Sequence, residues 1–196
     1  MGDRPDCDRV AESSTANRRI LGIDPGTVAT GWGVVELGAG SLIHVAHGAI
    51  SSRAGRSQPL RLARIYRGLR EILVRYEPQG ISLEKVFFAR NPQSVLKLGQ
   101  ARGVALLAAA ESGVEVHEYS SAEIKLAVVG YGQATKEQVQ KMVGSLLRLS
   151  GKLPADAADA LAAAVCDLHQ SSFQSRVMAA VPGAGRELRR WKNVSR

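Results

Sequence analysis

Apolar residues follow two different patterns along the chain, and the alternation of these patterns predicts the order of strands and helices. The apolar run at 19–24 (RILGID) is typical of a buried central strand. Two further strands are expected at 31–37 and 41–50, and the Gly-Ala-Gly sequence between them predicts an antiparallel hairpin. The folded part of the chain is therefore expected to begin with three strands.

Helical periodicity begins after these strands. Apolar residues recur every three or four positions over 60–76 and arginines fall mostly between them, which predicts an amphipathic helix that ends before Pro78. The remaining pattern predicts, in chain order, a strand at 81–86, a helix at 91–112, a strand at 114–119, helices at 121–129 and 135–149, and a last helix from Pro154 to about Gln170. This order predicts an α/β fold with a mixed five-stranded sheet and helices on both faces.

One folded domain is expected at 18–172, because a chain of 196 residues is long enough to bury a single core. Residues 1–17 lack periodicity and are expected to form a disordered leader, and residues 173–196 are expected to form a basic, disordered tail. No apolar run approaches the roughly 20 residues of a membrane span. The first residues also lack the apolar stretch of a secretory signal, so a cytoplasmic protein is expected.

The formal net charge of +8 favours a polyanionic partner, although much of this charge lies near the C-terminus. Residues 176–196 carry six basic side chains against Glu187, a balance of +5, whereas residues 1–19 are balanced. The segment between them therefore holds only +3, and a basic tail can also be a solubilising end. The two cysteines, Cys7 and Cys166, are too few for a disulfide framework and fit a reducing compartment.

Two acidic residues are placed on strands of the expected sheet. Asp24 ends the first strand and is followed by Pro-Gly-Thr, where a carboxylate is held on rigid backbone at an edge of the sheet that commonly binds ligands. It could instead cap the turn, a common role of Asp. Glu84 lies in an apolar strand, where burial without a partner costs several kcal/mol, so it needs a cation unless it lies at a solvated edge.

Two further acids, Asp156 and Asp159, lie three residues apart near the start of the last helix and therefore share a face. Acids in a first turn also favour the helix dipole, which is the simpler explanation of this pair. The two like charges repel each other, however, and a divalent cation between them would relieve that repulsion. Four carboxylates on three elements form an oxygen-rich ligand set that suits Mg²⁺ or Mn²⁺, and two such ions can catalyse hydrolysis of a phosphodiester.

Four segments resemble, in order, the signature segments of the RuvC family. They are GIDPGTVATGWGVVE at 22–36, LEKVFFARNPQSVLKLGQARG at 83–103, AVVGYGQATKEQVQKMV at 127–143 and PADAADALAAAV at 154–165. The resemblance covers roughly residues 19–170 and implies a ribonuclease-H-like fold and a homodimer that makes paired nicks in opposed strands of a Holliday junction. It also implies that Asp24, Glu84, Asp156 and Asp159 are the metal-binding catalytic acids, and that the branch-migration proteins RuvA and RuvB are partners.

The same resemblance implies a set of residues that contact DNA. Phe87 resembles an aromatic that stacks at the junction centre, although either Phe87 or Phe88 could instead face the core. Lys125 and Lys136 resemble basic residues near the scissile phosphate, and without the resemblance each would be interpreted as a surface lysine. Weaker candidates for contacts with the DNA backbone are Arg90, Lys97 and Arg102.

Two other functions remain possible at the level of sequence. The segment GIDPGT also resembles the phosphate loop of actin-like kinases and ATPases, but those proteins need two such domains around the nucleotide. A junction-binding scaffold without nuclease activity would be expected to lack an acid, whereas all four are present.

Overall fold

The computed structural model describes residues 17–52, 57–85 and 92–180. Outside the described residues lie positions 1–16 of the leader expected at 1–17, the candidate DNA contacts Phe87 and Arg90, and positions 181–196 of the tail expected at 173–196. The elements, in chain order, are β1 (Arg18–Asp24), β2 (Ala29–Gly38), β3 (Ser41–Ser51), α1 (Gln58–Tyr76), β4 (Gly80–Glu84), α2 (Pro92–Glu111), β5 (Glu115–Tyr119), α3 (Ser121–Val129), α4 (Lys136–Leu146) and α5 (Ala155–Ala180).

The five strands form one mixed sheet in the order β3-β2-β1-β4-β5. Strands β1, β2 and β3 are antiparallel neighbours, whereas β4 runs parallel to both β1 and β5. The prediction of a mixed five-stranded sheet that begins with an antiparallel hairpin is therefore confirmed. No helix in the described parts of the chain is long and apolar enough to cross a membrane.

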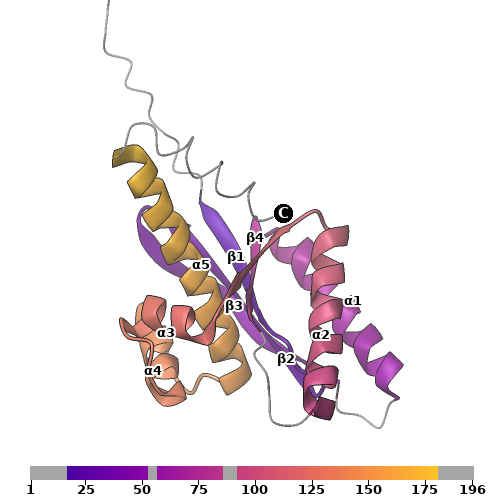
Figure 1. Cartoon of the computed structure of the whole chain (residues 1–196). Helices are drawn as coiled ribbons and strands as arrows, with labels where there is room; N and C mark the ends of the chain where they lie inside the picture. The colour runs from indigo at the N-terminus through magenta and orange to yellow at the C-terminus, as the bar shows by residue number, and fades with distance from the viewer. Residues whose placement is uncertain (1–16, 53–56, 86–91, 181–196) are drawn as a thin grey trace, which may run out of the picture.

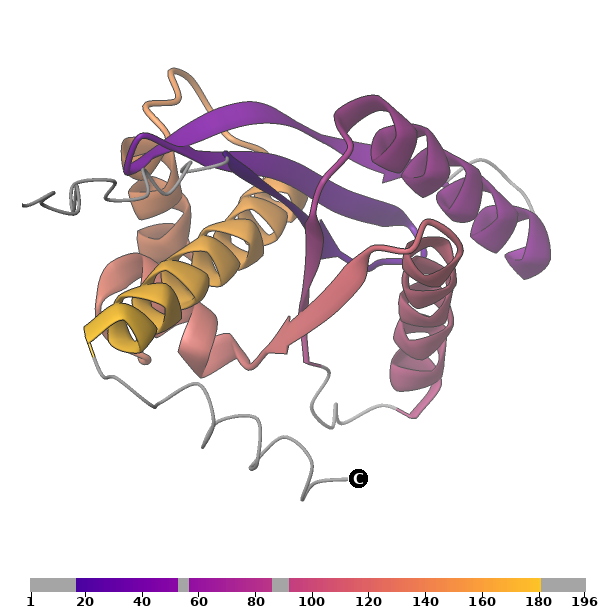
Figure 2. The same ribbon diagram turned by 90° about the horizontal axis from the view of Figure 1, so that it is seen from above.

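Helices cover both faces of the sheet, as the sequence predicted (Figures 1 and 2). Helices α1 and α2 enclose one core with one face of the sheet, in which Leu21, Ile23 and Leu83 are buried. Helices α3, α4 and α5 enclose a second core on the opposite face, where Ile20 and Val35 pack against α5. Alternate side chains of β1 thus enter different cores, as the period of a strand requires.

Most element boundaries lie within one to three residues of the prediction, and the end of α5 differs by about ten. Strand β4 ends at Glu84 rather than at residue 86. Helix α5 continues to Ala180, about ten residues beyond the expected end near Gln170, because residues 171–180 contain neither Gly nor Pro to stop it. The expected domain boundary at residue 172 falls inside this helix.

Helix α5 lies close to β1 and β2, because glycines face it. A Cβ atom at Gly22 would overlap the carbonyl oxygen of Ala160, and one at Gly31 would overlap the carbonyl oxygen of Asp156. The hydroxyl of Ser82 in β4 also donates a hydrogen bond of 2.7 Å to the carbonyl oxygen of Ala163. These contacts fix the height of α5 above the central strands.

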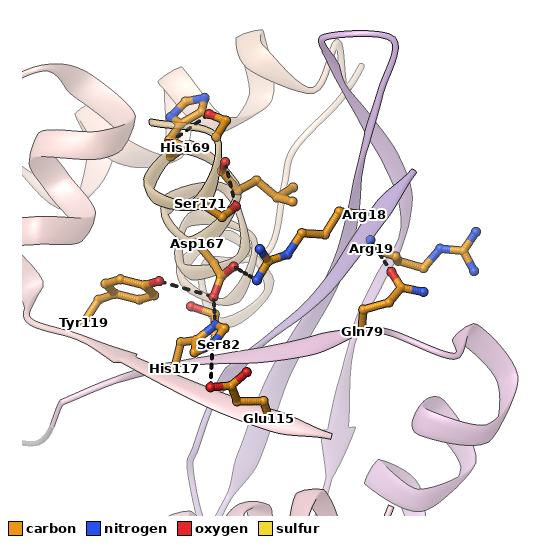
Figure 3. Close-up of polar contacts among 12 residues, drawn as sticks. Arg18, Arg19, Gln79, Ser82, Glu115, His117, Tyr119, Asp167, His169 and Ser171 are labelled. Carbon is orange, nitrogen blue, oxygen red and sulfur yellow. Dashed lines mark hydrogen bonds and ion pairs between the residues drawn. The ribbon is translucent and has the colours of Figure 1, made fainter. Parts of the chain in front are cut away.

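A buried polar network fixes α5 at a second place (Figure 3). The carboxylate of Asp167 is fully buried, and its Oδ1 lies 3.3 Å from Nη2 of Arg18 in β1. Its Oδ2 lies 2.5 Å from Nδ1 of His117 and accepts a hydrogen bond of 3.3 Å from the hydroxyl of Tyr119, both in β5. Nε2 of His117 in turn lies 3.5 Å from Glu115. Because a buried charge needs partners, this network holds α5 in one position relative to both strands.

Candidate active site

Two of the four predicted acids lie side by side at the carboxyl ends of parallel strands. Ile23 of β1 is paired with Leu83 of β4, so Asp24 and Glu84 follow at equivalent positions. Gly22 and Ser82, two residues earlier in each strand, both contact α5. Because side chains alternate along a strand, Asp24 and Glu84 face the α5 side of the sheet as well.

The other two acids lie at the beginning of α5, over the same end of the sheet. Helix α5 begins at Ala155, so Asp156 is in its first turn. Gly31 of β2 is the cross-strand partner of Asp24 and lies directly beneath the backbone of Asp156. The close approach of α5 to the sheet therefore brings Asp156 and Asp159 near Asp24.

The electrostatics of Asp24 show that the four carboxylates act on one another. Burial raises the pKa of Asp24 to about 7, with further contributions from the negative charges of Asp159, Asp156 and Glu84 in that order. The positive charge of Lys136 opposes this rise. An acid with such a pKa indicates an excess of negative charge in a partly desolvated place.

Lys136 of α4 is the cation that faces these acids. Its Nζ lies 3.0 Å from Oδ2 of Asp159. This hydrogen bond and the charge of Asp159 raise the pKa of Lys136, and the charges of Asp24 and Glu84 contribute to the rise. Because the lysine side chain is 80% exposed, the ion pair can exchange partners at little cost in stability.

The chemistry of this donor set fits a hard divalent cation, because all four groups are carboxylates and their mutual repulsion would be relieved by a positive ion. Within the described residues, however, no group of three or more His, Cys, Asp or Glu side chains is gathered closely enough to hold a metal ion. The four acids thus share one electrostatic environment without being collected around a single point. The metal-binding role of Asp24, Glu84, Asp156 and Asp159 stays a prediction.

A small pocket of about 160 Å³ joins this site to the predicted basic residues. Its lining includes Glu84, Asp159, Lys125 and Lys136. The structure therefore brings both predicted lysines to the acids. Contact between these lysines and DNA remains a prediction.

Two of the three weaker candidates, Lys97 and Arg102, fall within the described residues, and neither lines this pocket. Arg102 of α2 forms an ion pair with Glu118 of β5. Its guanidinium is therefore engaged within the fold. Lys97 is exposed on α2, away from the pocket that the acids line.

Comparison with known proteins shows the family to which this chain is similar. The model of the family described as crossover junction endodeoxyribonuclease RuvC matches residues 20–167. A RuvC of Pelobacter propionicus is 48% identical over 89% of this chain and 99% of its own length, and a RuvC of Geobacter sulfurreducens is 50% identical over 80% and 96%. The structure of Thermus thermophilus RuvC in complex with a Holliday junction substrate superimposes with a TM-score of 0.76, at 33% identity over 80% of this chain and 96% of that one.

The fold is ribonuclease-H-like, as the resemblance implied, and the similar proteins are crossover junction endodeoxyribonucleases. The chain belongs to the RuvC family.

Proposed function

We propose that this protein is a structure-selective DNA endonuclease that resolves Holliday junctions during recombination and repair, by paired metal-dependent nicks in opposed strands. The observation that carries the proposal is the shared environment of carboxylates from β1, β4 and α5, where burial, followed by the negative charges of Asp159, Asp156 and Glu84, raises the pKa of Asp24 to about 7. The Thermus thermophilus relative, which is 33% identical over 80% of this chain, was solved in complex with a Holliday junction substrate.

The proposal is tested by incubating the protein with an end-labelled four-way junction and Mg²⁺ or Mn²⁺. Paired nicks placed symmetrically about the junction are expected, and linear duplex of the same sequence should stay intact. Hydrolysis of ATP without junction cleavage would favour an actin-like ATPase instead. Tight junction binding with no cleavage under either metal would favour a scaffold.

The metal is proposed to be Mg²⁺, with Mn²⁺ as a substitute and two ions in each active site. Asp24, Glu84, Asp156 and Asp159 would hold it. When bound, such ions activate water and neutralise the charge that develops on a phosphodiester during hydrolysis. The carboxylates from strands and helix supply rigid attachment points, because their backbones belong to packed elements.

The lysines beside the acids are proposed to hold the DNA strand. Hydrolysis requires a water oxygen to attack phosphorus while the bond to the leaving sugar oxygen breaks, so the phosphate must be aligned with the acids. Lys125 and Lys136 line the pocket next to Glu84 and Asp159. Their charges can contact the phosphates on either side of the bond that breaks.

The role of these two lysines predicts a change in the salt dependence of DNA binding. Lys125→Ala and Lys136→Ala should each reduce the slope of log affinity against log salt by about one, because each lost phosphate contact releases one counterion fewer. Lys141→Ala is the control, since this exposed lysine lies on α4 outside the pocket. Slopes for both variants that match the wild-type slope would make Lys125 and Lys136 ordinary surface lysines.

A symmetric homodimer is proposed to supply the second nick, because one active site cuts one strand at a time. Leu96, Gly99, Gly103 and Leu107 recur along one face of α2. The side chains of Leu96 and Leu107 are 66% and 53% exposed. A Cβ at Gly99 or Gly103 would meet no described atom within 4 Å, so these glycines do not serve to fit α2 against its own sheet. The face is therefore open to a second copy of the helix.

Gly103→Leu should shift the protein towards monomer in analytical ultracentrifugation and leave mainly single nicks, because the added side chain would separate the two helices. Gly144→Leu in α4 is a matched control, since a Cβ there also meets open space. A Gly103→Leu variant that remains dimeric and still makes paired cuts would place the interface on another surface.

RuvA and RuvB are proposed as partners, and the cytoplasm as the compartment, on the basis of family membership. Association would be tested by co-sedimentation of the purified proteins on junction DNA.

A further inference from the structure

An open groove on the face of the sheet opposite α5 is not explained by the acid site or by the proposed dimer face. It lies between α1 and the edge strand β3 and has a volume of about 680 Å³. Its lining includes the aromatic rings of Trp32 and Tyr76, whose centroids lie 5.7 Å apart, and the apolar side chain of Ile50. The groove thus combines aromatic and apolar surface with the arginines of α1.

The charge of this groove comes from α1, which carries five arginines and one glutamate. Two of the arginines are engaged within the fold: Arg61 donates a hydrogen bond to the carbonyl oxygen of Thr27, and Arg70 forms an ion pair with Glu111. The remaining three arginines are exposed and line the groove; they are Arg64, Arg67 and Arg75.

None of these three guanidinium groups forms an ion pair with a carboxylate in the part of the chain that the structure describes, although Glu71 lines the same groove. Arg75 lies over the ring of Tyr76 at 5.3 Å, and Arg67 donates only to the carbonyl oxygen of Ala63. The lining therefore carries a net charge of +2, three arginines less one glutamate, with donors that remain available for an anion.

The spacing of these arginines suits a repeating anion. Arg64 and Arg75 are eleven residues apart, which corresponds to about 16 Å along a helix, and successive phosphates of one DNA strand rise by about 3.4 Å. Planar guanidinium groups bind phosphate with two parallel hydrogen bonds. Arg61, one turn before Arg64, donates a hydrogen bond to the carbonyl oxygen of Thr27 in the loop that follows Asp24, so α1 connects this end of the groove to that loop.

We propose that this groove binds the sugar–phosphate backbone of a junction arm outside the cleavage site. The inference rests on the proposed function, since it presumes a DNA substrate. A four-way junction has arms that extend well beyond the nicked phosphates, so a second surface on the α1 side adds affinity and orients the arms without touching the reacting atoms.

The test compares a triple variant, Arg64→Gln with Arg67→Gln and Arg75→Gln, with the wild type. Binding is measured over a range of salt concentrations to junctions with long arms, to junctions with arms shorter than one duplex turn of about 10 base pairs, and to linear duplex. For long-armed junctions and for linear duplex, the magnitude of the slope of log affinity against log salt should decrease by about two to three, at about 0.9 for each lost phosphate contact. On short-armed junctions it should change by less than one. The cleavage rate at saturating junction should stay at the wild-type value.

A matched control removes three charges from a different surface, through Lys141→Gln with Arg148→Gln and Lys152→Gln on the α4 side. Thermal denaturation checks that both triple variants are folded. If the control variant shows an equally large decrease in the slope of log affinity against log salt, the effect comes from total charge rather than from this groove, and the proposal is overturned. An unchanged slope in the groove variant would also overturn the proposal. The groove would then be a candidate binding site for an acidic protein instead of DNA.

A different result would contradict the proposed function, namely a wild-type protein that does not cleave junctions. The slope on linear duplex still decides the role of the groove in that case.

Discussion

Asp24→Asn is expected to reduce junction cleavage by on the order of a thousandfold or more, because loss of a metal-binding carboxylate removes several kcal/mol of transition-state stabilisation. Junction binding should be retained or become slightly tighter, since Asn removes a negative charge that repels phosphate. Single-turnover cleavage of a labelled junction and equilibrium binding in Ca²⁺ or EDTA measure the two effects separately. Glu137→Gln on the exposed side of α4 is the control and should cleave normally. Cleavage at the wild-type rate would remove Asp24 from the catalytic site.

The same substitution should stabilise the metal-free protein at alkaline pH, which gives a readout that does not depend on activity. The folded-state pKa of Asp24 is about 7, against 3.8 for an unperturbed carboxyl. Ionisation is therefore easier in the unfolded state, and wild-type stability is lost as pH rises from about 4 to about 7, by an amount on the order of a few kcal/mol. Asn cannot ionise and avoids this loss.

Thermal melts in EDTA at pH 8 should consequently show a higher melting temperature for Asp24→Asn than for wild type, and the difference should disappear near pH 4. Addition of Mg²⁺ should stabilise the wild type more than the variant. Equal melting temperatures at pH 8 would mean that burial and the charges of the other acids do not raise the pKa of Asp24 in the folded protein.

The order of strands and helices could be predicted from the sequence because each element carries its own hydrophobic period. The run at 19–24 and the three- to four-residue spacing over 60–76 report local burial directly. Helix ends are less well determined. The prediction ended α5 near Gln170, where the apolar pattern weakens, but residues 171–180 contain no proline or glycine that would interrupt the helix.

The positions of the acids could be predicted only in part. The expected strand end placed Asp24 at an edge of the sheet, and spacing placed Asp156 and Asp159 on one face of a helix. Glu84 was expected inside a strand at 81–86, whereas it ends β4 beside Asp24. The proximity of the two pairs depends on how closely α5 approaches β1 and β2. That distance is set by glycines, which have no hydrophobic period and so gave no signal.

The network around Asp167 was missed for a related reason. Its partners Arg18, His117 and Tyr119 come from two strands that are far from it in sequence. A signal was present nonetheless, since Asp167 directly follows the apolar run at 160–166 of this alanine-rich helix and needs a partner if it is buried. The sequence shows that such a partner is required but not which residue provides it.

Gly22→Ala is expected to destabilise the protein by about 3 kcal/mol or more, at or beyond the upper end of the usual range for overpacking. The added methyl group would overlap the carbonyl oxygen of Ala160, which belongs to the backbone of α5 and cannot rotate away as a side chain can. Relief requires α5 to move, yet Ser82 and Asp167 hold the helix to neighbouring strands. Urea unfolding monitored by circular dichroism measures the loss.

Gly80→Ala is the matched control, because Gly80 is also a buried strand residue but its added methyl group would meet the flexible end of the Ile20 side chain, at 2.9 Å. That contact can be relieved by a rotamer change, at a cost of about 1 kcal/mol. If Gly22→Ala still folds, its displaced α5 should also carry Asp156 and Asp159 away from Asp24, so that cleavage falls while the salt dependence of DNA binding stays the same. A Gly22→Ala variant as stable and as active as Gly80→Ala would show that α5 can retreat from the sheet without loss, and that the close approach of this helix does not position the acids.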